Sequence, residues 1–166
     1  MAAQVSAEKL QAAHSTTDEA RHCGRSQSRA IRQVIAVDSN ILIRYVVRDV
    51  PSLAEKATAL INDAMARREP IFVSLVVLAE CVWVFKTTYR FPKTHLISFV
   101  EALLQENGFL LENRDAVIDS LQEFRTGRGD VADYLIGQLG KSKGSSTTFT
   151  FDRGLRGSPH FTVLST

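Results

Sequence analysis

Asp38 and Asp152 each stand directly after a short apolar run, a place suited to holding a cation. Such runs are typical of buried parallel strands, and open parallel sheets bind ligands at the carboxyl ends of their strands. The alternative for each aspartate is an ordinary helix cap, although Ser39 and Asn40 offer the same cap beside Asp38. Two strand-end aspartates together indicate a shared acidic edge of the sheet.

Glu80 is predicted to lie in a helix that is apolar on nearly every side, because residues 75–85 are otherwise all apolar. Burying an unpaired carboxylate costs several kcal/mol. The nearest basic residue, Lys86, lies six positions further along and points elsewhere on the helix. A structural glutamate paired with an arginine from another element is the alternative. We expect a functional carboxylate, because buried acids often mark functional sites.

Asp130 and Asp133 stand three residues apart at the start of a predicted helix, which puts both carboxylates on one face. Compensation of the helix dipole explains one of them, but two acids on one face repel each other unless a cation lies between them. Neither histidine nor cysteine accompanies these acids, and hard oxygen ligands select Mg²⁺ or Mn²⁺ over zinc. With no serine, cysteine or histidine placed as a nucleophile, the pattern predicts metal-assisted hydrolysis by activated water.

The elements that position these acids follow from the hydrophobic pattern, in which strands alternate with helices. Ile41, Leu42 and Tyr45 begin a helical spacing directly after the first acid. Usually two helices separate successive strands, so we expect an α/β fold with three layers, α/β/α, around a central parallel sheet. The strands are predicted at residues 34–37, 71–73, 109–111, 147–151 and 161–164.

Composition excludes several other classes of protein. The chain has 166 residues and a mean hydropathy near zero, and no apolar stretch is long enough to span a bilayer. Residues 1–32 are polar, lack a signal-peptide pattern and are predicted to be a poorly ordered extension, which leaves residues 33–166 as one domain. Cys23 and Cys81 lack metal-ligand spacing, and Cys81 is predicted to be a buried hydrophobe in a reduced, cytoplasmic setting.

Four segments together resemble the PIN-domain nucleases, and within that family the VapC-type toxins of bacterial type II toxin–antitoxin pairs. The resemblance covers residues 33–164, so the expected fold is PIN-like. Each segment alone is a weak signal, whereas four in the family's order make a strong one. They are AVDSNILIRY at 36–45, LAECVWV at 78–84, GDVADYLI at 129–136 and TFD at 150–152.

The resemblance implies an endoribonuclease that holds Mg²⁺ or Mn²⁺ with four acids. By the family's pattern these acids are Asp38, Glu80, Asp133 and Asp152. Asp130 is a neighbouring carboxylate found in part of the family and is an additional candidate ligand. Asn40 is implied to help position metal-bound water, and Thr150 is an accompanying hydroxyl. The resemblance further implies a homodimer, formed through helices on one side, and neutralisation by a cognate antitoxin protein.

Basic residues flank the acidic segments and are candidates for contacts with RNA phosphates. The net charge of +2 is too small to indicate a nucleic-acid partner by itself. Arg128 and Arg153 are the favoured candidates, because each lies within two residues of a site acid. A solvated surface charge is the alternative for each. Tyr45 or Tyr89 are candidates to stack on a base, with packing in the core or an interface as the alternative.

Two other functions stay open. A Mg²⁺-dependent phosphohydrolase needs a nucleophilic aspartate with a second aspartate two residues later, or a lysine at a later strand end. Here Asn40 stands two residues after Asp38, and no predicted strand ends in lysine. A catalytically silent PIN module, acting as a scaffold for RNA or protein, is the other alternative, because a fold does not guarantee an activity.

Overall fold

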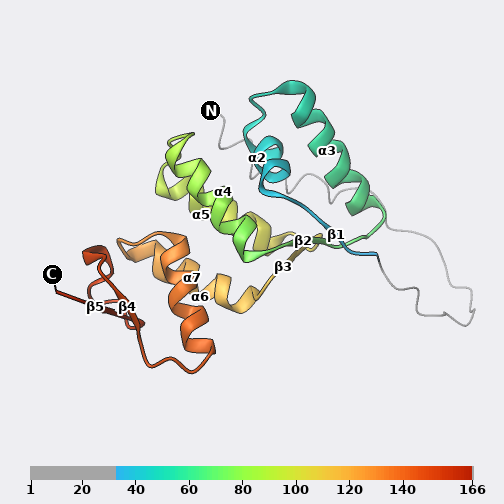
Figure 1. Cartoon of the computed structure of the whole chain (residues 1–166). Helices are drawn as coiled ribbons and strands as arrows, with labels where there is room; N and C mark the ends of the chain where they lie inside the picture. Colours follow the sequence, from blue (N-terminus) through green and yellow to red (C-terminus); the bar gives the residue numbers. More distant parts are fainter. Residues whose placement is uncertain (1–32, 166) are drawn as a thin grey trace, which may run out of the picture.

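Five strands and six α-helices alternate along residues 33–165, the part of the chain that the computed structural model describes (Figure 1). The prediction made for residues 1–32 lies outside this range. The order confirms the α/β class. The elements are β1 (Ile35–Ala36), α2 (Ser39–Val47), α3 (Pro51–Ala66), β2 (Ile71–Val73), α4 (Leu75–Thr87), α5 (Lys93–Gln105), β3 (Phe109–Leu111), α6 (Arg114–Thr126), α7 (Val131–Ser142), β4 (Thr148–Thr150), the 3-10 turn η2 (Arg153–Leu155) and β5 (Phe161–Val163).

The strands are parallel, as predicted, but they divide between two sheets. One sheet has the order β1-β2-β3, with Ile35 opposite Ile71 and Phe72 opposite Leu110. The other consists of β4 and β5 alone. Each parallel connection within the first sheet runs through a pair of helices, since parallel neighbours require a long crossover. The hydrophobic pattern predicts which segments form strands, but it does not reveal which strands pair with which.

The core lies between β2 and the helices around it. Ile71 and Val73 of β2 are buried, and Leu78 and Phe85 of α4 are completely inaccessible to solvent. Helix α4 begins at Leu75, because the Ser74 hydroxyl accepts a hydrogen bond from the Val77 amide at 3.2 Å and so caps its first turn. Strand β2 and helix α4 therefore form the centre of the core, against which the neighbouring elements pack.

The N-terminal helices and the C-terminal elements lie at opposite ends of the molecule (Figure 1). Helices α2 and α3 lie at one end, whereas α6, α7, β4 and β5 lie at the other, with α4 and α5 between them. Helices α6 and α7 pack closely together, and α5 contacts α6. None of the helices within residues 33–165 combines the length and the apolar character that crossing a membrane requires.

Candidate functional site

Asp38 lies between β1 and α2, where it is exposed and caps the helix. Its Oδ1 accepts a hydrogen bond from the Ser39 amide at 2.8 Å, and its Oδ2 accepts one from Asn40 Nδ2 at 2.9 Å. These bonds stabilise the ionised form and hold the pKa of Asp38 below its ordinary value, with the Asn40 bond the largest contribution. The cap is therefore Asp38 itself, although Ser39 and Asn40 are also residues that can cap a helix.

Glu80 is exposed, so the prediction that it is a buried carboxylate is wrong. Helix α4 is apolar almost all round in sequence, yet only one face of it packs into the core. The face that carries Glu80 also carries Val76 and Trp83, which are 76% and 61% exposed. Glu80 therefore incurs no cost of burial, and its position carries no strain that a metal would have to relieve.

Asp38 and Glu80 both lie close enough to the buried Cys81 thiol for their charges to act on it. Cys81 Sγ lies 3.8 Å from the Ser39 carbonyl oxygen, which joins α4 to the start of α2. Burial, followed by the negative charges of Glu80 and Asp38, raises the pKa of Cys81 to about 12. The expectation that Cys81 is an inert buried hydrophobe is confirmed, and its neighbourhood brings two of the predicted site acids together.

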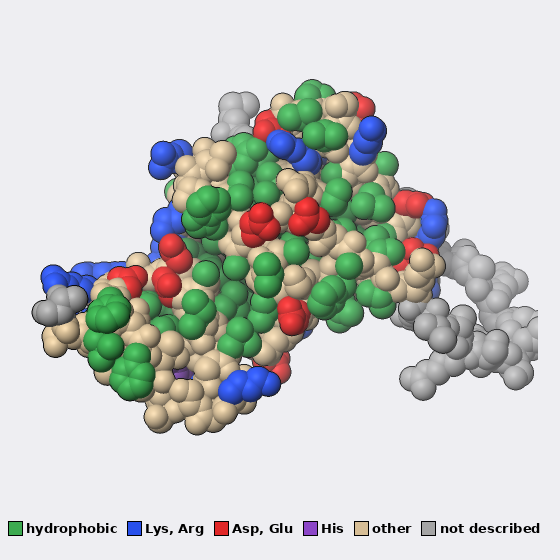
Figure 2. Space-filling view, viewed as in Figure 1, with side chains coloured by type: hydrophobic (Ala, Val, Ile, Leu, Met, Phe, Trp, Pro, Cys, Tyr) green, Lys and Arg blue, Asp and Glu red, His purple; other side chains and the backbone are tan. Residues whose placement is uncertain are grey.

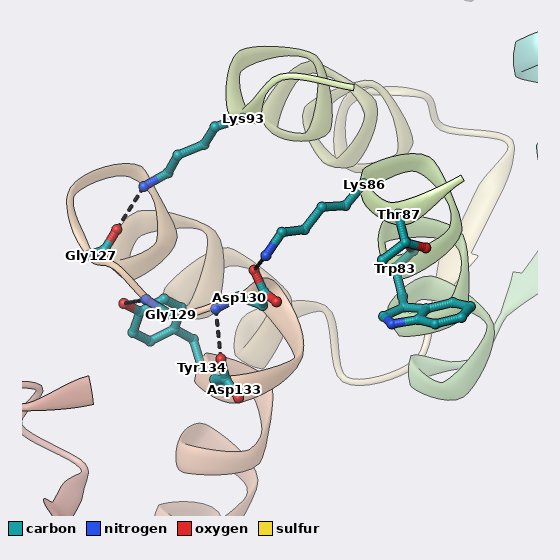
Figure 3. Close-up of polar contacts among 9 residues, drawn as sticks. All are labelled: Trp83, Lys86, Thr87, Lys93, Gly127, Gly129, Asp130, Asp133 and Tyr134. Atoms are coloured by element: carbon teal, nitrogen blue, oxygen red, sulfur yellow. Dashed lines mark hydrogen bonds and ion pairs between the residues drawn. The ribbon is translucent and has the colours of Figure 1, made fainter. Parts of the chain in front are cut away.

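Asp130 and Asp133 form a second acidic place at the start of α7, and both have partners from the protein (Figure 3). Lys86 Nζ reaches from α4 to Asp130 Oδ1 at 2.5 Å. The Asp133 carboxylate accepts a hydrogen bond from the Asp130 amide at 2.7 Å. The positive charge expected beside these two acids is therefore supplied by the Lys86 side chain, which pairs with Asp130. Figure 3 also shows the Trp83 indole projecting from the same helix as Lys86.

The turn before α7 is held by close packing. The Gly129 amide donates a hydrogen bond to Tyr134 Oη at 3.0 Å, and Lys93 Nζ donates one to the Gly127 carbonyl at 2.7 Å (Figure 3). A Cβ added at Gly127 would lie 1.8 Å from Tyr134 Oη, so only glycine fits there. Lys93 also lies over the Phe124 ring. Lys93 therefore holds this turn against α6.

Asp152 is the third acidic place, at the end of β4. Its Oδ1 accepts a hydrogen bond from the Gly154 amide at 2.7 Å, so it caps η2. Its own amide donates to Thr150 Oγ1 at 3.0 Å. Thr150 therefore accompanies this acid, and the helix-cap alternative is realised at both Asp38 and Asp152. Because β4 pairs with β5 and not with β1, the two strand-end aspartates do not share one edge.

The predicted acids come from three parts of the described chain. Asp38 and Glu80 come from the start of α2 and from α4, Asp130 and Asp133 from the start of α7, and Asp152 from the end of β4. Within residues 33–165, no three histidine, cysteine or acidic side chains lie close enough together to hold one metal ion. Figure 2 likewise shows Asp and Glu side chains in several small groups on this face. The oxygen donors suit Mg²⁺ or Mn²⁺ chemically, but their arrangement here does not form a complete coordination sphere.

The candidate RNA contacts fall into two groups, tyrosines that pack within the protein and arginines that line a pocket. Tyr89 packs against Phe85 and Phe91, and its hydroxyl donates to Asp49 at 2.7 Å, which confirms the packing alternative for this tyrosine. Tyr45 is partly buried against the core. Arg128 and Arg153 instead line one pocket, and Arg156 joins them there. Arg156 was missed because it lies four residues beyond the nearest site acid in sequence.

Comparison with known proteins agrees with the fold. A sequence profile of the PIN domain matches residues 35–157, well over half of the chain. The match includes all the predicted site acids from Asp38 to Asp152. No curated protein and no solved structure gives a significant match. The parallel α/β fold is consistent with this profile. The chain therefore belongs to the PIN-domain family.

Proposed function

We propose that this protein is a Mg²⁺- or Mn²⁺-dependent endoribonuclease and the toxin of a type II toxin–antitoxin pair. The observation that carries the proposal is the PIN-domain match, because most members of this family are metal-dependent nucleases. The four acids that the family pattern requires all fall inside the match, in order. None of the four is fully buried, so each carboxylate can reach a cation or a substrate from solvent.

The residues of this chain have distinct roles in the proposed reaction. When bound, a divalent cation would supply an activated water and neutralise charge on the phosphodiester. Asp38 is suited to bind that cation, since it is an exposed carboxylate whose hydrogen bonds with Ser39 and Asn40 lower its pKa and fix its orientation. Asn40 acts on Asp38 through their hydrogen bond and is therefore a positioning residue. Glu80, Asp133 and Asp152 are the further proposed ligands, with Asp130 as an additional one.

The proposal requires the separate acidic places to approach one another. Asp38 and Glu80 supply one pair, and at least one carboxylate from α7 or from the end of β4 must join them. The Lys86–Asp130 ion pair links α4 to α7, and both side chains are about half exposed. Exposed ion pairs of this kind contribute only about 0–1 kcal/mol, so this contact offers little resistance to such a shift.

The partners are part of the proposal. RNA is the substrate, an antitoxin protein neutralises the enzyme, and two copies form a homodimer in the cytoplasm. Exposed apolar side chains support a protein partner, since a soluble surface rarely leaves so many uncovered. The largest such side chains on α4, α7 and the second sheet are Val76, Trp83, Ile136 and Phe149.

A catalytically silent PIN module is the second candidate, and the separation of the acids favours it. The two functions differ in one measurement. Purified protein is incubated with structured RNA while Mg²⁺ or Mn²⁺ is titrated and then removed with a chelator. The nuclease proposal predicts cleavage that appears with metal and disappears with the chelator, whereas a silent module shows none. Release of phosphate from a phosphomonoester without RNA cleavage would favour a phosphohydrolase.

The same assay tests the role of Asp38. Asp38→Asn keeps the shape and the capping oxygen but removes the charge, so we expect cleavage to fall by about 100-fold or more. Asp63→Asn is the matched control, because Asp63 is an exposed acid on α3 whose partner is Arg67. It should cleave within about twofold of the native protein. Equal rates for Asp38→Asn and the native protein would remove this carboxylate from the mechanism.

A further inference from the structure

A pocket of about 660 Å³ opens beside the acids of the C-terminal half. Its walls are the end of α6, the turn at residues 126–128 and the loop at residues 153–159. Arg128, Arg153 and Arg156 line it together with Tyr134. A volume of this size suits a small organic ligand or one nucleotide unit of a longer chain.

The three arginines of this pocket are exposed and make no salt bridge or side-chain hydrogen bond with any of residues 33–165. Arginines elsewhere in the same range are often paired, as Arg44 is with Asp49 and Arg125 is with Glu101. A concentration of three uncompensated guanidinium groups around one hollow creates a positive potential there. The pocket is therefore suited to an anionic ligand.

The one acid that lines the pocket is already engaged. Glu123 Oε1 accepts a hydrogen bond from Gln138 Nε2 at 2.8 Å and lies 3.4 Å from His160 Nε2, and Oε2 accepts one from Ser158 Oγ at 3.2 Å. These contacts attach the loop before β5 to α6 and α7. Glu123 thus stabilises the wall of the pocket, and its single negative charge stands against the three positive charges of the arginines, which leaves the lining net positive.

We propose that this pocket binds backbone phosphates of the RNA strand, with Arg128, Arg153 and Arg156 as the contacts. This assignment rests on the proposed function for the identity of its ligand. The guanidinium fork matches two phosphate oxygens at once, which makes arginine the residue best suited to this task. Arg128 precedes Asp130 by two residues, and Arg153 directly follows Asp152. A strand held by these arginines therefore passes directly beside two of the site acids.

Glycines leave the backbone of the pocket open to a bulky ligand. Gly127, Gly154 and Gly157 all line it. Gly157 has a φ of +90°, a conformation that side chains rarely adopt, and a Cβ there would meet nothing within 4 Å. The pocket thus combines charged side chains with bare backbone, which suits the approach of a polymer that carries phosphate at every unit.

The test measures RNA binding in the presence of a chelator, so that cleavage plays no part in it. Fluorescence anisotropy of a labelled single-stranded RNA of about 12 nucleotides is recorded over a range of salt concentrations. Each lost phosphate contact should make the slope of log K against log salt shallower by about 0.7. We expect single Arg→Gln variants at 128, 153 and 156 to show this change, and the triple variant a change of about 2.

Arg68→Gln is the matched control, since Arg68 is also exposed and unpaired within residues 33–165 but follows α3, outside the pocket. Its slope should equal that of the native protein. A triple variant with the native slope would overturn the assignment, as would an acidic peptide that competes as well as unlabelled RNA of equal charge. Native protein that binds RNA through these arginines but never cleaves it would refute the nuclease proposal and leave the pocket assignment intact.

Discussion

Two regions of the molecule hold their acids in different surroundings. Around Asp38 and Glu80, which we call the α2–α4 region, neither acid has a lysine or arginine partner within residues 33–165. In the C-terminal region, residues 114–163, Asp130 is paired with Lys86, and three free arginines line a pocket beside the acids. The α2–α4 region is thus suited to attract a cation, and the C-terminal region to hold an anion.

This difference suggests that one region binds the metal ion and the other binds the RNA phosphates. A phosphodiester needs both kinds of contact, because its charge must be neutralised while a cation-bound water attacks it. The α2–α4 region rests on fully buried side chains of α4, whereas the C-terminal region is joined to it by few contacts. Substitutions in one region, compared with substitutions in the other, therefore distinguish their contributions.

The largest expected difference is between Glu80→Gln and Asp130→Asn. No basic side chain within residues 33–165 pairs with Glu80, so its loss should reduce metal-dependent RNA cleavage by about 100-fold. Asp130 is already compensated by Lys86, so its loss should cost less than about 10-fold. Cleavage rates at saturating Mg²⁺ give the comparison. Equal losses in the two variants would mean that the two acidic places contribute alike.

A smaller difference is expected between two glycines. Gly127→Ala places a Cβ 1.8 Å from Tyr134 Oη and should lower the free energy of unfolding by about 1–3 kcal/mol. A Cβ added by Gly108→Ala would contact only the flexible Met65 side chain, at 3.1 Å. This change should alter the free energy of unfolding by less than about 1 kcal/mol. Urea denaturation of each variant measures this. A more damaging change at Gly108 would show that the C-terminal turn is the more adaptable one.

The Cys81 thiol provides a smaller test of the α2–α4 region, in a Cys23→Ser background so that one thiol is left. The pKa of Cys81 in the folded protein is about 12, against an ordinary value of 9.0. Between these two pH values the thiol stays protonated in the folded protein and ionises in the unfolded chain. The stability due to this thiol is therefore present below pH 9 and is lost as the pH rises toward 12. Native protein at pH 8 should react with a thiol reagent far more slowly than in denaturant. Equally fast reaction would show that Cys81 is not buried.

The smallest effect is expected for Asn40→Ala. This change removes the hydrogen bond that contributes most to the lowered pKa of Asp38, so that pKa should rise toward its ordinary value of 3.8. A lowered carboxyl pKa stabilises the fold above the ordinary value, and this contribution is lost as the pH falls through the lowered one. Carboxyl chemical shifts of Asp38 recorded across pH 2–6 measure it. An unchanged titration would show that Asn40 does not act on Asp38.

Sequence reasoning could predict the parts of the fold that depend on local pattern. The alternation of strands and helices, the parallel pairing and the Ser74 cap all follow from residues close together in the chain. The separation of β4 and β5 from the other strands does not, because strand pairing depends on contacts between distant segments.

The site residues stay a prediction, and their expected geometry was in part wrong. The four acids all fall within the residues that the PIN-domain match covers. The burial of Glu80 was predicted wrongly, because an apolar helix buries only the faces that find a partner, and one face of α4 finds none within the described chain. Arg156 and the exposed Trp83 were missed for a related reason, since exposure is decided by packing and not by the residue alone.

The most direct test asks whether acids from both regions act on one metal ion. Mn²⁺ binding by isothermal titration calorimetry is measured for the native protein, Asp38→Asn and Asp152→Asn, with Asp63→Asn as the control. If the two regions share a site, Asp38→Asn and Asp152→Asn should each weaken the same binding event by about 10-fold or more. If Asp152→Asn binds Mn²⁺ like the native protein while Asp38→Asn does not, the shared site is contradicted.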